Sequence, residues 1–241
     1  MLQLMFALAI DDVMNELTYP ENFICRKATP NFTEGKEILF RRFPKYLYSG
    51  MKKQEIKLKF DPLTPANWKR FETLMGEKGG CGNCWCMYFR LPYKDFQENK
   101  PDGNKKMIKQ LVNKGMPQGL IASLNDEPVG WIALAPREDY MKIENSRVFK
   151  RIDDKPVWSI TCFFIKKGFR HMGLSQQLIK GTIDFAKTEK IKVLEAYPAI
   201  PYAEKVPHPF LWVGVLSSFI KNGFKIVRQN SKSRAMVRID L

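Results

Sequence analysis

Alternation of apolar and polar residues predicts most of the strands of this chain. Residues 55–60 alternate with a period of two, which is typical of a half-buried strand. Residues 119–124 and 129–135 flank a polar turn at residues 125–127, so we expect a hairpin there. Residues 157–165 are apolar on both faces, which predicts a strand at the centre of a sheet. Shorter strands are expected at residues 193–197, 224–228 and 235–239.

Apolar residues spaced three or four apart predict the helices. Thr64 and Pro65 are suited to the start of the first helix, and Gly76 is suited to its end. Three more helices are expected at residues 104–115, 174–190 and 211–222. The predicted order is β-α-α-β-β-β-α-β-α-β-β, and the fold class is therefore a mixed α/β domain.

The first part of the chain has a different pattern from the rest. Residues 1–52 mix aromatic, proline and basic residues without a clear period, apart from a short amphipathic helix expected at residues 1–16. We interpret residues 1–52 as an N-terminal appendage and residues 53–241 as one domain. The apolar run at residues 2–10 is too short to span a membrane, and acidic residues follow it at once. No membrane partner is expected, and crowded cysteines favour the reducing cytoplasm.

The net charge indicates an anionic partner without identifying it. The 241 residues include 40 Lys+Arg and 25 Asp+Glu, a net charge of +15. Residues 1–52 hold 7 basic and 6 acidic side chains, so 33 and 19 remain in residues 53–241, a net charge of +14. A nucleic acid, an anionic membrane or a phosphorylated small molecule would each suit this excess. The basic residues are dispersed and form no recognised nucleic-acid motif, which argues against the first.

One segment carries the chemistry. Residues 163–175 read as the end of the central strand, a basic turn and the start of a helix. Such a turn directs backbone N–H groups at one point, and the helix dipole attracts anions to it. Arg170 and His171 add donors, and Gly173 allows a ligand to approach the backbone. The chain has no G-x-x-x-x-G-K-[ST] motif and no G-x-G-x-x-G after a strand, which excludes the P-loop and disfavours a Rossmann site.

The sequence Arg170-His-Met-Gly173-Leu-Ser175 resembles the R/Q-x-x-G-x-G/A loop of the GNAT superfamily of N-acetyltransferases. Ser175 replaces the usual Gly or Ala. The hairpin strand at 127–132, the strand at 157–165, the helix after the loop and the ending at 219–224 keep the order of that family. The resemblance implies a mostly antiparallel sheet with a splayed central strand. It also implies acetyl-CoA as co-substrate and no metal, with the cofactor held by Phe163, Ile165, Arg170, His171, Met172, Gly173, Leu174 and Ser175.

The catalytic groups of the family are not all found. Many members carry a Tyr in the last helix as general acid, at a position that corresponds to Phe219, and some carry a Glu where this chain has Ser159. Glu195 and Tyr197 lie two apart on one strand and therefore point to the same side. If that side lines the cleft, Glu195 is the candidate base and Tyr197 the candidate acid; otherwise they belong to the sheet rim.

Other residues are candidates for the acceptor side. Glu138 and Asp139 follow the third strand and could bind a cationic acceptor, or they could be solvated loop acids. His208 in the proline-rich loop could line the acceptor site, or it could be a surface histidine. The segment 81–90, which contains C-x-x-C-x-C, resembles that of uncharacterised bacterial GNAT proteins with a C-W-C-M sequence. Three thiolates lack the fourth ligand of a structural zinc site, so we favour packing of apolar thiols over a metal.

The leading hypothesis is an enzyme that transfers an acetyl group from acetyl-CoA to an amine of a small molecule or a protein, by direct attack in a ternary complex. The alternative is a sensor that binds CoA or acyl-CoA on the same scaffold without turnover. A monomer or a homodimer is expected, and nucleic acid is not an expected partner.

Overall fold

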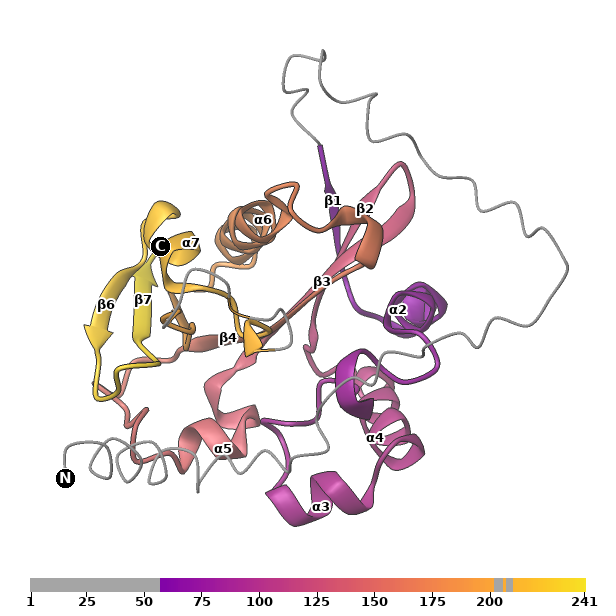
Figure 1. The fold of residues 1–241 in the computed structure, drawn as a ribbon, viewed down its shortest axis with the longest axis horizontal. Coiled ribbons are helices and arrows are strands. Elements are labelled where there is room, and N and C mark those ends of the chain that lie inside the picture. Colours follow the sequence, from indigo (N-terminus) through magenta and orange to yellow (C-terminus); the bar gives the residue numbers. More distant parts are fainter. Residues whose placement is uncertain (1–56, 202–205, 207–209) are drawn as a thin grey trace, which may run out of the picture. The chain divides into compact units, whose positions relative to one another are not determined.

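A sheet of seven strands is the centre of the protein in the computed structural model, which describes residues 57–201, 206 and 210–241 (Figure 1). The strands are β1 (Lys59–Pro62), β2 (Gly119–Leu124), β3 (Glu127–Pro136), β4 (Trp158–Ile165), β5 (Val193–Ala196), β6 (Lys225–Arg228) and β7 (Met236–Asp240). Their order across the sheet is β1-β2-β3-β4-β5-β7-β6. Strands β4 and β5 are parallel, and the other neighbours are antiparallel. The fold is therefore mixed α/β with a mostly antiparallel sheet, as predicted.

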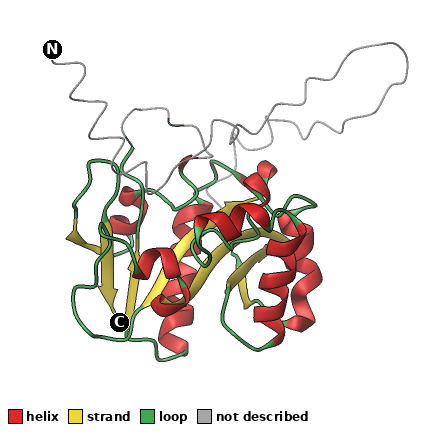
Figure 2. Ribbon diagram, turned by 90° about the horizontal axis from the view of Figure 1, so that it is seen from below, coloured by secondary structure: helices red, strands yellow, loops and turns green. Residues whose placement is uncertain are grey.

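Helices cover both faces of this sheet, and Figure 2 shows them packed against the strands. Neighbouring residues on β3 point to opposite faces. Trp131 packs on Phe71 of α2 (Trp68–Met75) with ring centroids 4.5 Å apart, whereas Ile132 joins the core that contains Leu178 of α6 (Leu174–Thr188). The helices are α2 (Trp68–Met75), α3 (Tyr93–Glu98), α4 (Asp102–Asn113), α5 (Met141–Glu144), α6 (Leu174–Thr188) and α7 (Leu216–Lys221).

The central strand β4 separates from its parallel neighbour partway along its length. The two strands pair over three positions, Trp158–Ile160 on β4 and Leu194–Ala196 on β5. A register shift in the β3–β4 ladder follows at once, and β4 continues to Ile165 without β5. Beyond this point, residues 211–215 lie beside β4, because the N–H of Phe163 donates to the carbonyl of Trp212 at 2.6 Å. The splayed strand expected from the sequence is present.

The periodicity located the long elements correctly. Strands β2, β3 and β4 and helix α6 lie where they were expected. The last helix was predicted at residues 211–222, but α7 begins only at Leu216. Residues 211–214 form a turn instead, in which the N–H of Gly214 donates to the carbonyl of Leu211 at 2.9 Å and Gly214 has a φ of 79° that a helix does not accept. The short helices α3 and α5 were not predicted, since six and four residues carry too little periodic signal.

Some expectations fall outside the described residues. These are the predicted appendage at 1–52 with its helix at 1–16, the first part of the predicted strand at 55–60, and His208. Residues Leu58–Leu241 form one compact unit. In the part of the chain that the structure describes, no helix is long and apolar enough to cross a membrane.

Candidate functional site

The turn between β4 and α6 has the backbone shape of an anion site. After a 3-10 turn at Lys167–Phe169, His171 and Gly173 both adopt positive φ angles, 65° and 76°. Gly173 caps α6 in the left-handed conformation, and no other atom lies within 4 Å of the place where a Cβ would stand. The first N–H groups of a helix have no partner within the helix. The N–H groups at Leu174 and Ser175 therefore lie at the positive end of a 15-residue helix, beside open space at Gly173.

The basic side chains of this turn have different partners. Lys166 is paired with Glu127 at 2.5 Å, and the Nε of Arg170 donates to the carbonyl of Ile165 at 3.1 Å. The second contact holds the turn against the end of β4. Lys167 is exposed. Lys166 is largely offset by its carboxylate partner, so attraction of phosphates by Lys167 and Arg170 stays a prediction.

The free edge of β4 presents the two backbone groups that were predicted to bind the cofactor. The N–H of Lys166 donates to Val129 on β3, so alternation along the strand directs the N–H groups of Ile165 and Phe163 to the other side. That side is the gap between β4 and β5. The N–H of Phe163 is already bonded to Trp212, and a ligand that paired with it would displace the Trp212 carbonyl.

Phe219 is the residue at which the resemblance implied the general acid of the family. It is fully buried on α7, and its ring meets the ring of Phe163 at a centroid distance of 5.8 Å in an edge-on arrangement. It also packs edge-on against Phe224 at 5.1 Å. The position therefore faces the predicted cofactor strand, but the side chain has no proton to donate.

Glu195 and Tyr197 share one side of the sheet, as predicted, and they lie in a buried network of charges. The hydroxyl of Tyr197 donates to Oε1 of Glu195 at 2.6 Å. Arg137 forms an ion pair with the same oxygen, and Arg238 binds Oε2 through Nη2 at 2.9 Å. Glu195 is 0 % exposed and Tyr197 is 2 % exposed. The carboxylate thus lies between two guanidinium groups and does not border an open cleft.

The arginines of this network were missed by the sequence analysis. Arg137 follows β3, and its guanidinium also binds the carbonyls of Ile143 and Phe149. Arg238 reaches the network from β7 and continues to Asp153 at 2.6 Å. The three strands involved are far apart in sequence, so no local pattern could have signalled the cluster.

The hydroxyl of Tyr197 is held in its protonated form. Burial and the adjacent Glu195 carboxylate raise the pKa of Tyr197 well above its usual value. Ser159 on β4 lies 2.9 Å from the same hydroxyl. Tyr197 therefore joins the start of β4 to the network. Participation of either Glu195 or Tyr197 in proton transfer stays a prediction.

Glu138 and Asp139, predicted on the acceptor side, both have arginine partners. Arg151 donates to Glu138 at 2.6 Å, and Arg90 lies 3.4 Å from Asp139. Burial opposes the charged form of Glu138, but the hydrogen bond from Arg151 prevails and lowers the pKa of that carboxyl. Binding of a cationic acceptor by these two residues stays a prediction, and it would compete with these arginines.

The cysteine segment, residues 81–90, turns sharply and packs against β3 and β4 through Cys86. Trp85 and Cys86 have positive φ angles of 43° and 59°, unusual for residues other than glycine. The indole N–H of Trp131 donates to the Cys86 sulfur at 3.0 Å. A hydrogen bond with Cys86, together with burial, raises the pKa of the Cys162 thiol well above its usual value. A protonated, buried thiol is a poor nucleophile, so Cys162 acts as a core residue.

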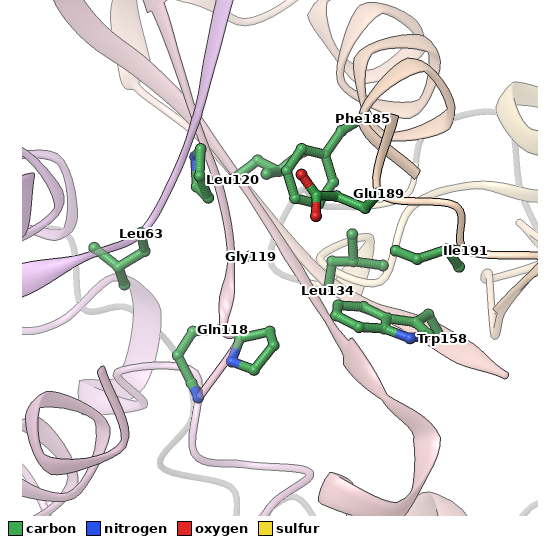
Figure 3. A pocket seen from close by; sticks show the side chains of 11 residues that line it. Leu63, Gln118, Gly119, Leu120, Leu134, Trp158, Phe185, Glu189 and Ile191 are labelled. Carbon is green, nitrogen blue, oxygen red and sulfur yellow. The ribbon is translucent and has the colours of Figure 1, made fainter. Parts of the chain in front are cut away.

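No group of three or more His, Cys, Asp or Glu side chains is arranged to hold a metal within residues 57–201, 206 and 210–241. A separate cavity of about 130 Å³ lies near the C-terminal end of α6, and the turn at residues 166–175 lies at the other end of that helix (Figure 3). Phe185, Glu189 and Trp158 are among its lining residues, and none of the predicted site residues is.

A parallel strand pair that separates partway, a turn with two positive φ angles and a 15-residue helix follow one another in this α/β fold. The family model described as "Acetyltransferase (GNAT) family" matches residues 85–206. The chain therefore belongs to the GNAT acetyltransferase family. No curated protein sequence matches it.

Solved structures with a similar fold belong to acetyltransferases. A GNAT-family acetyltransferase from Listeria monocytogenes is 10% identical with a TM-score of 0.48, over 79% of this chain and 99% of that one. Arabidopsis thaliana NAA60, in complex with acetyl-CoA, is 13% identical with a TM-score of 0.42, over 77% and 100% of the two chains. The PaiA N-acetyltransferase from Thermoplasma acidophilum, in complex with coenzyme A, is 12% identical with a TM-score of 0.43, over 77% and 99%.

Proposed function

We propose that this protein transfers the acetyl group of acetyl-CoA to an amine. The observation that carries the proposal is the turn at residues 166–175, where the first N–H groups of α6 and the open space at Gly173 face one point beside the free edge of β4. Pyrophosphate suits such a point because the helix dipole and the free N–H groups favour negative charge. In this proposal residues 170–175 hold the pyrophosphate.

The pantetheine arm would lie along β4 as an added strand. Its amides would pair with the backbone of Phe163 and Ile165, whose N–H groups face the gap between β4 and β5. The Trp212 carbonyl currently accepts the hydrogen bond from Phe163, so residues 211–214 would release this N–H when the arm binds. An N–H group at this edge could also polarise the thioester carbonyl in the reaction.

The reaction needs a neutral amine, a polarised carbonyl and a proton for the leaving thiolate. The amine nitrogen attacks the thioester carbonyl in a ternary complex, the C–S bond breaks, and CoA leaves. Tyr197 is the proposed proton donor of the sequence analysis, and its buried hydroxyl, which donates to Glu195, would have to leave that hydrogen bond to reach the thiolate. Glu195 is the proposed base of the sequence analysis, but its two arginine partners favour a role in positioning Tyr197.

A second function is favoured by one observation. Phe219 faces the cofactor strand without a hydroxyl, and the Glu195 carboxylate is already paired with two guanidinium groups. A scaffold without a ready acid or base would suit a sensor that binds CoA or acyl-CoA without turnover.

Thermal unfolding with acetyl-CoA tests the binding step. At a ligand concentration of about 100 Kd, the native state gains about 2.7 kcal/mol. For a domain of this size that raises Tm by roughly 5–11 °C. Gly173→Ala should weaken the effect, because its φ of 76° strains an alanine and the methyl group enters the open space. Gly168→Ala is the matched control, since this glycine lies in the same turn with a negative φ and free space around it.

Two results would separate the alternatives. A folded protein that shows no shift at saturating acetyl-CoA contradicts both functions. A shift without release of free CoA thiol across a broad panel of amines supports the sensor, whereas acetylation of any amine at a catalytic rate removes it.

A further inference from the structure

The cavity near the C-terminal end of α6 has the size of one aromatic ring. Its volume is about 130 Å³, and its apolar walls come from segments far apart in the chain. Leu63 follows β1, Leu134 lies on β3, Trp158 begins β4, Phe185 lies on α6 and Ile191 follows it (Figure 3). An apolar cavity of about 150 Å³ is known to bind benzene. The space therefore suits a small ligand with a single ring.

The sheet holds the walls of this cavity in place. The N–H of Leu63 donates to the carbonyl of Gly119 at 3.0 Å, and the N–H of Leu134 donates to the carbonyl of Gln118 at 3.2 Å. These hydrogen bonds join the ends of β1, β2 and β3, and all four residues line the cavity. The cavity is thus a feature of the folded sheet, and its lining does not depend on a loose loop.

Negative charge and aromatic rings meet at the rim. Glu189 is exposed and directly follows α6, and its side chain is among those around the cavity (Figure 3). The chain has 40 Lys+Arg against 25 Asp+Glu, yet within the described residues Glu189 forms no ion pair. The C-terminal end of a 15-residue helix adds partial negative charge at the same place. The half-buried rings of Phe185 and Trp158 also favour a cation.

Nearby lysines do not cancel this preference. Lys187 and Lys190 are exposed, so water and salt screen their charges. The rim therefore favours a cationic group that is attached to an apolar body, because the ring in the cavity holds the charge next to Glu189.

A buried hydrogen-bond acceptor lies on another part of the wall. Gln118 is 2 % exposed, and its Nε2 donates to the carbonyl of Met116 at 3.1 Å. Its Oε1 is buried and has no hydrogen-bond partner among the described residues. A buried acceptor without a donor is unfavourable, so a ligand that donates to it gains affinity. Figure 3 shows Gln118 and Glu189 on different sides of the cavity.

We propose that this cavity binds a small aromatic amine that carries a hydroxyl group on its ring. The ring fills the apolar space, the ammonium group lies at Glu189, and the hydroxyl donates to Oε1 of Gln118. An alkyl amine of this kind is protonated at pH 7, as lysine is. The turn at residues 166–175 lies at the other end of α6, so the inference does not depend on the proposed function.

Three related probes test the proposal on the full chain in the absence of acetyl-CoA. Tyramine has both polar groups, 4-ethylphenol lacks the amine, and phenethylamine lacks the hydroxyl. Of the five tryptophans only Trp158 lines the cavity, so its indole N–H signal in a ¹⁵N-labelled sample reports binding there. The Trp158→Phe variant identifies that signal by its loss.

Tyramine should shift the Trp158 signal saturably and bind more tightly than either comparator. One exposed ion pair predicts an affinity roughly two- to fivefold above that of 4-ethylphenol. One hydrogen bond predicts an affinity roughly two- to tenfold above that of phenethylamine. Equal affinity for tyramine and either comparator would overturn the proposal.

A pair of charge variants on one stretch of chain isolates the role of Glu189. Glu189→Gln should lower the affinity for tyramine to that for 4-ethylphenol and leave the affinity for 4-ethylphenol unchanged. Asp184→Asn is the matched control, since this exposed residue of α6 does not line the cavity and its loss changes the net charge equally. If both variants weaken tyramine binding alike, Glu189 does not hold the ammonium group and the proposal is wrong.

The position of the shifted signal separates this inference from the proposed function. If no probe shifts Trp158 saturably, the cavity does not bind this class of ligand. If tyramine shifts the signal of Trp212 instead, it binds beside the edge of β4, which overturns this inference and agrees with an amine acceptor there. A missing thermal shift with acetyl-CoA contradicts the proposed function and leaves the amine cavity standing.

Discussion

Replacing Glu195 by glutamine tests whether the buried charges at β5 stabilise the fold. The substitution keeps the shape of the side chain but removes the one negative charge that lies between Arg137 and Arg238. It also places an amide N–H₂ group where an oxygen now accepts a hydrogen bond. Glu195 and Arg137 are both buried, so water cannot solvate the guanidinium group of Arg137 once the negative charge is removed.

The magnitude follows from what each arginine keeps. Removing one partner of a buried ion pair typically costs about 3–5 kcal/mol. Arg238 retains Asp153 at 2.6 Å, and Arg137 retains Glu144 at 3.3 Å, so we expect the lower end, about 3 kcal/mol. For a domain of this size, Tm should fall by roughly 6–12 °C.

The assay is urea and thermal unfolding of the full chain, followed by tryptophan fluorescence and circular dichroism. Glu98→Gln is the matched control: this carboxylate on α3 is 62 % exposed and lies 3.9 Å from Lys94. Loss of such a surface pair should cost less than about 0.5 kcal/mol. A loss of less than about 1 kcal/mol for Glu195→Gln would refute the reasoning from burial. If Glu195→Gln keeps full stability but loses acetyl transfer, Glu195 is again the candidate base.

Two further predictions concern the helix α2 region. Gly79→Ala should destabilise the protein by more than about 2 kcal/mol, because the added Cβ would lie 2.3 Å from the Trp85 ring at a φ of 61°; urea unfolding measures this. Glu72→Gln should cost less than about 1 kcal/mol at pH 7, since Glu72 is partly exposed in its ion pairs with Lys105 and Lys69. Hydrogen bonds from Lys105 and Lys69 lower the pKa of Glu72 from 4.5 to about 2, so its stabilisation is complete above pH 4.5 and is lost as the pH falls through 2. The free energies of unfolding of wild type and Glu72→Gln should therefore become equal at the acid end of a pH series. A difference that stays constant with pH would contradict this.

The long elements of this fold could be predicted because each carries several periods of an apolar pattern. Strand β4 is the clearest case: its run of apolar residues on both faces indicates a central strand, and it is the fourth of seven. The turn after it could be predicted too, since Gly173 before an apolar helix is a local signal. Helix α7 was predicted five residues too early, because residues 211–214 form a turn whose Trp212 carbonyl accepts the N–H of Phe163 on β4, a tertiary contact that outweighs local periodicity.

The surroundings of the predicted site residues could not be predicted. Glu195 and Tyr197 two residues apart indicated a shared side, and the structure places them so. Their arginine partners come from residues 137 and 238, which are 58 and 43 positions away from Glu195 in sequence. The rings nearest to the Lys142 amine, those of Tyr88 and Phe96, likewise come from segments that lie more than 40 residues before it. Such long-range contacts leave no local mark in a single sequence.

The separation of β4 from β5 also bears on how the protein avoids self-association. The edge of a sheet offers unpaired N–H and C=O groups to any extended chain, which is a hazard in solution when it lies at the rim. Here the free edge of β4 opens inside the sheet, between two strands that pair only over Trp158–Ile160 and Leu194–Ala196. The protein's own chain also covers part of this edge, because the Trp212 carbonyl accepts the N–H of Phe163. Its backbone groups are therefore less exposed to a strand from another protein molecule than those of a strand at the rim of the sheet.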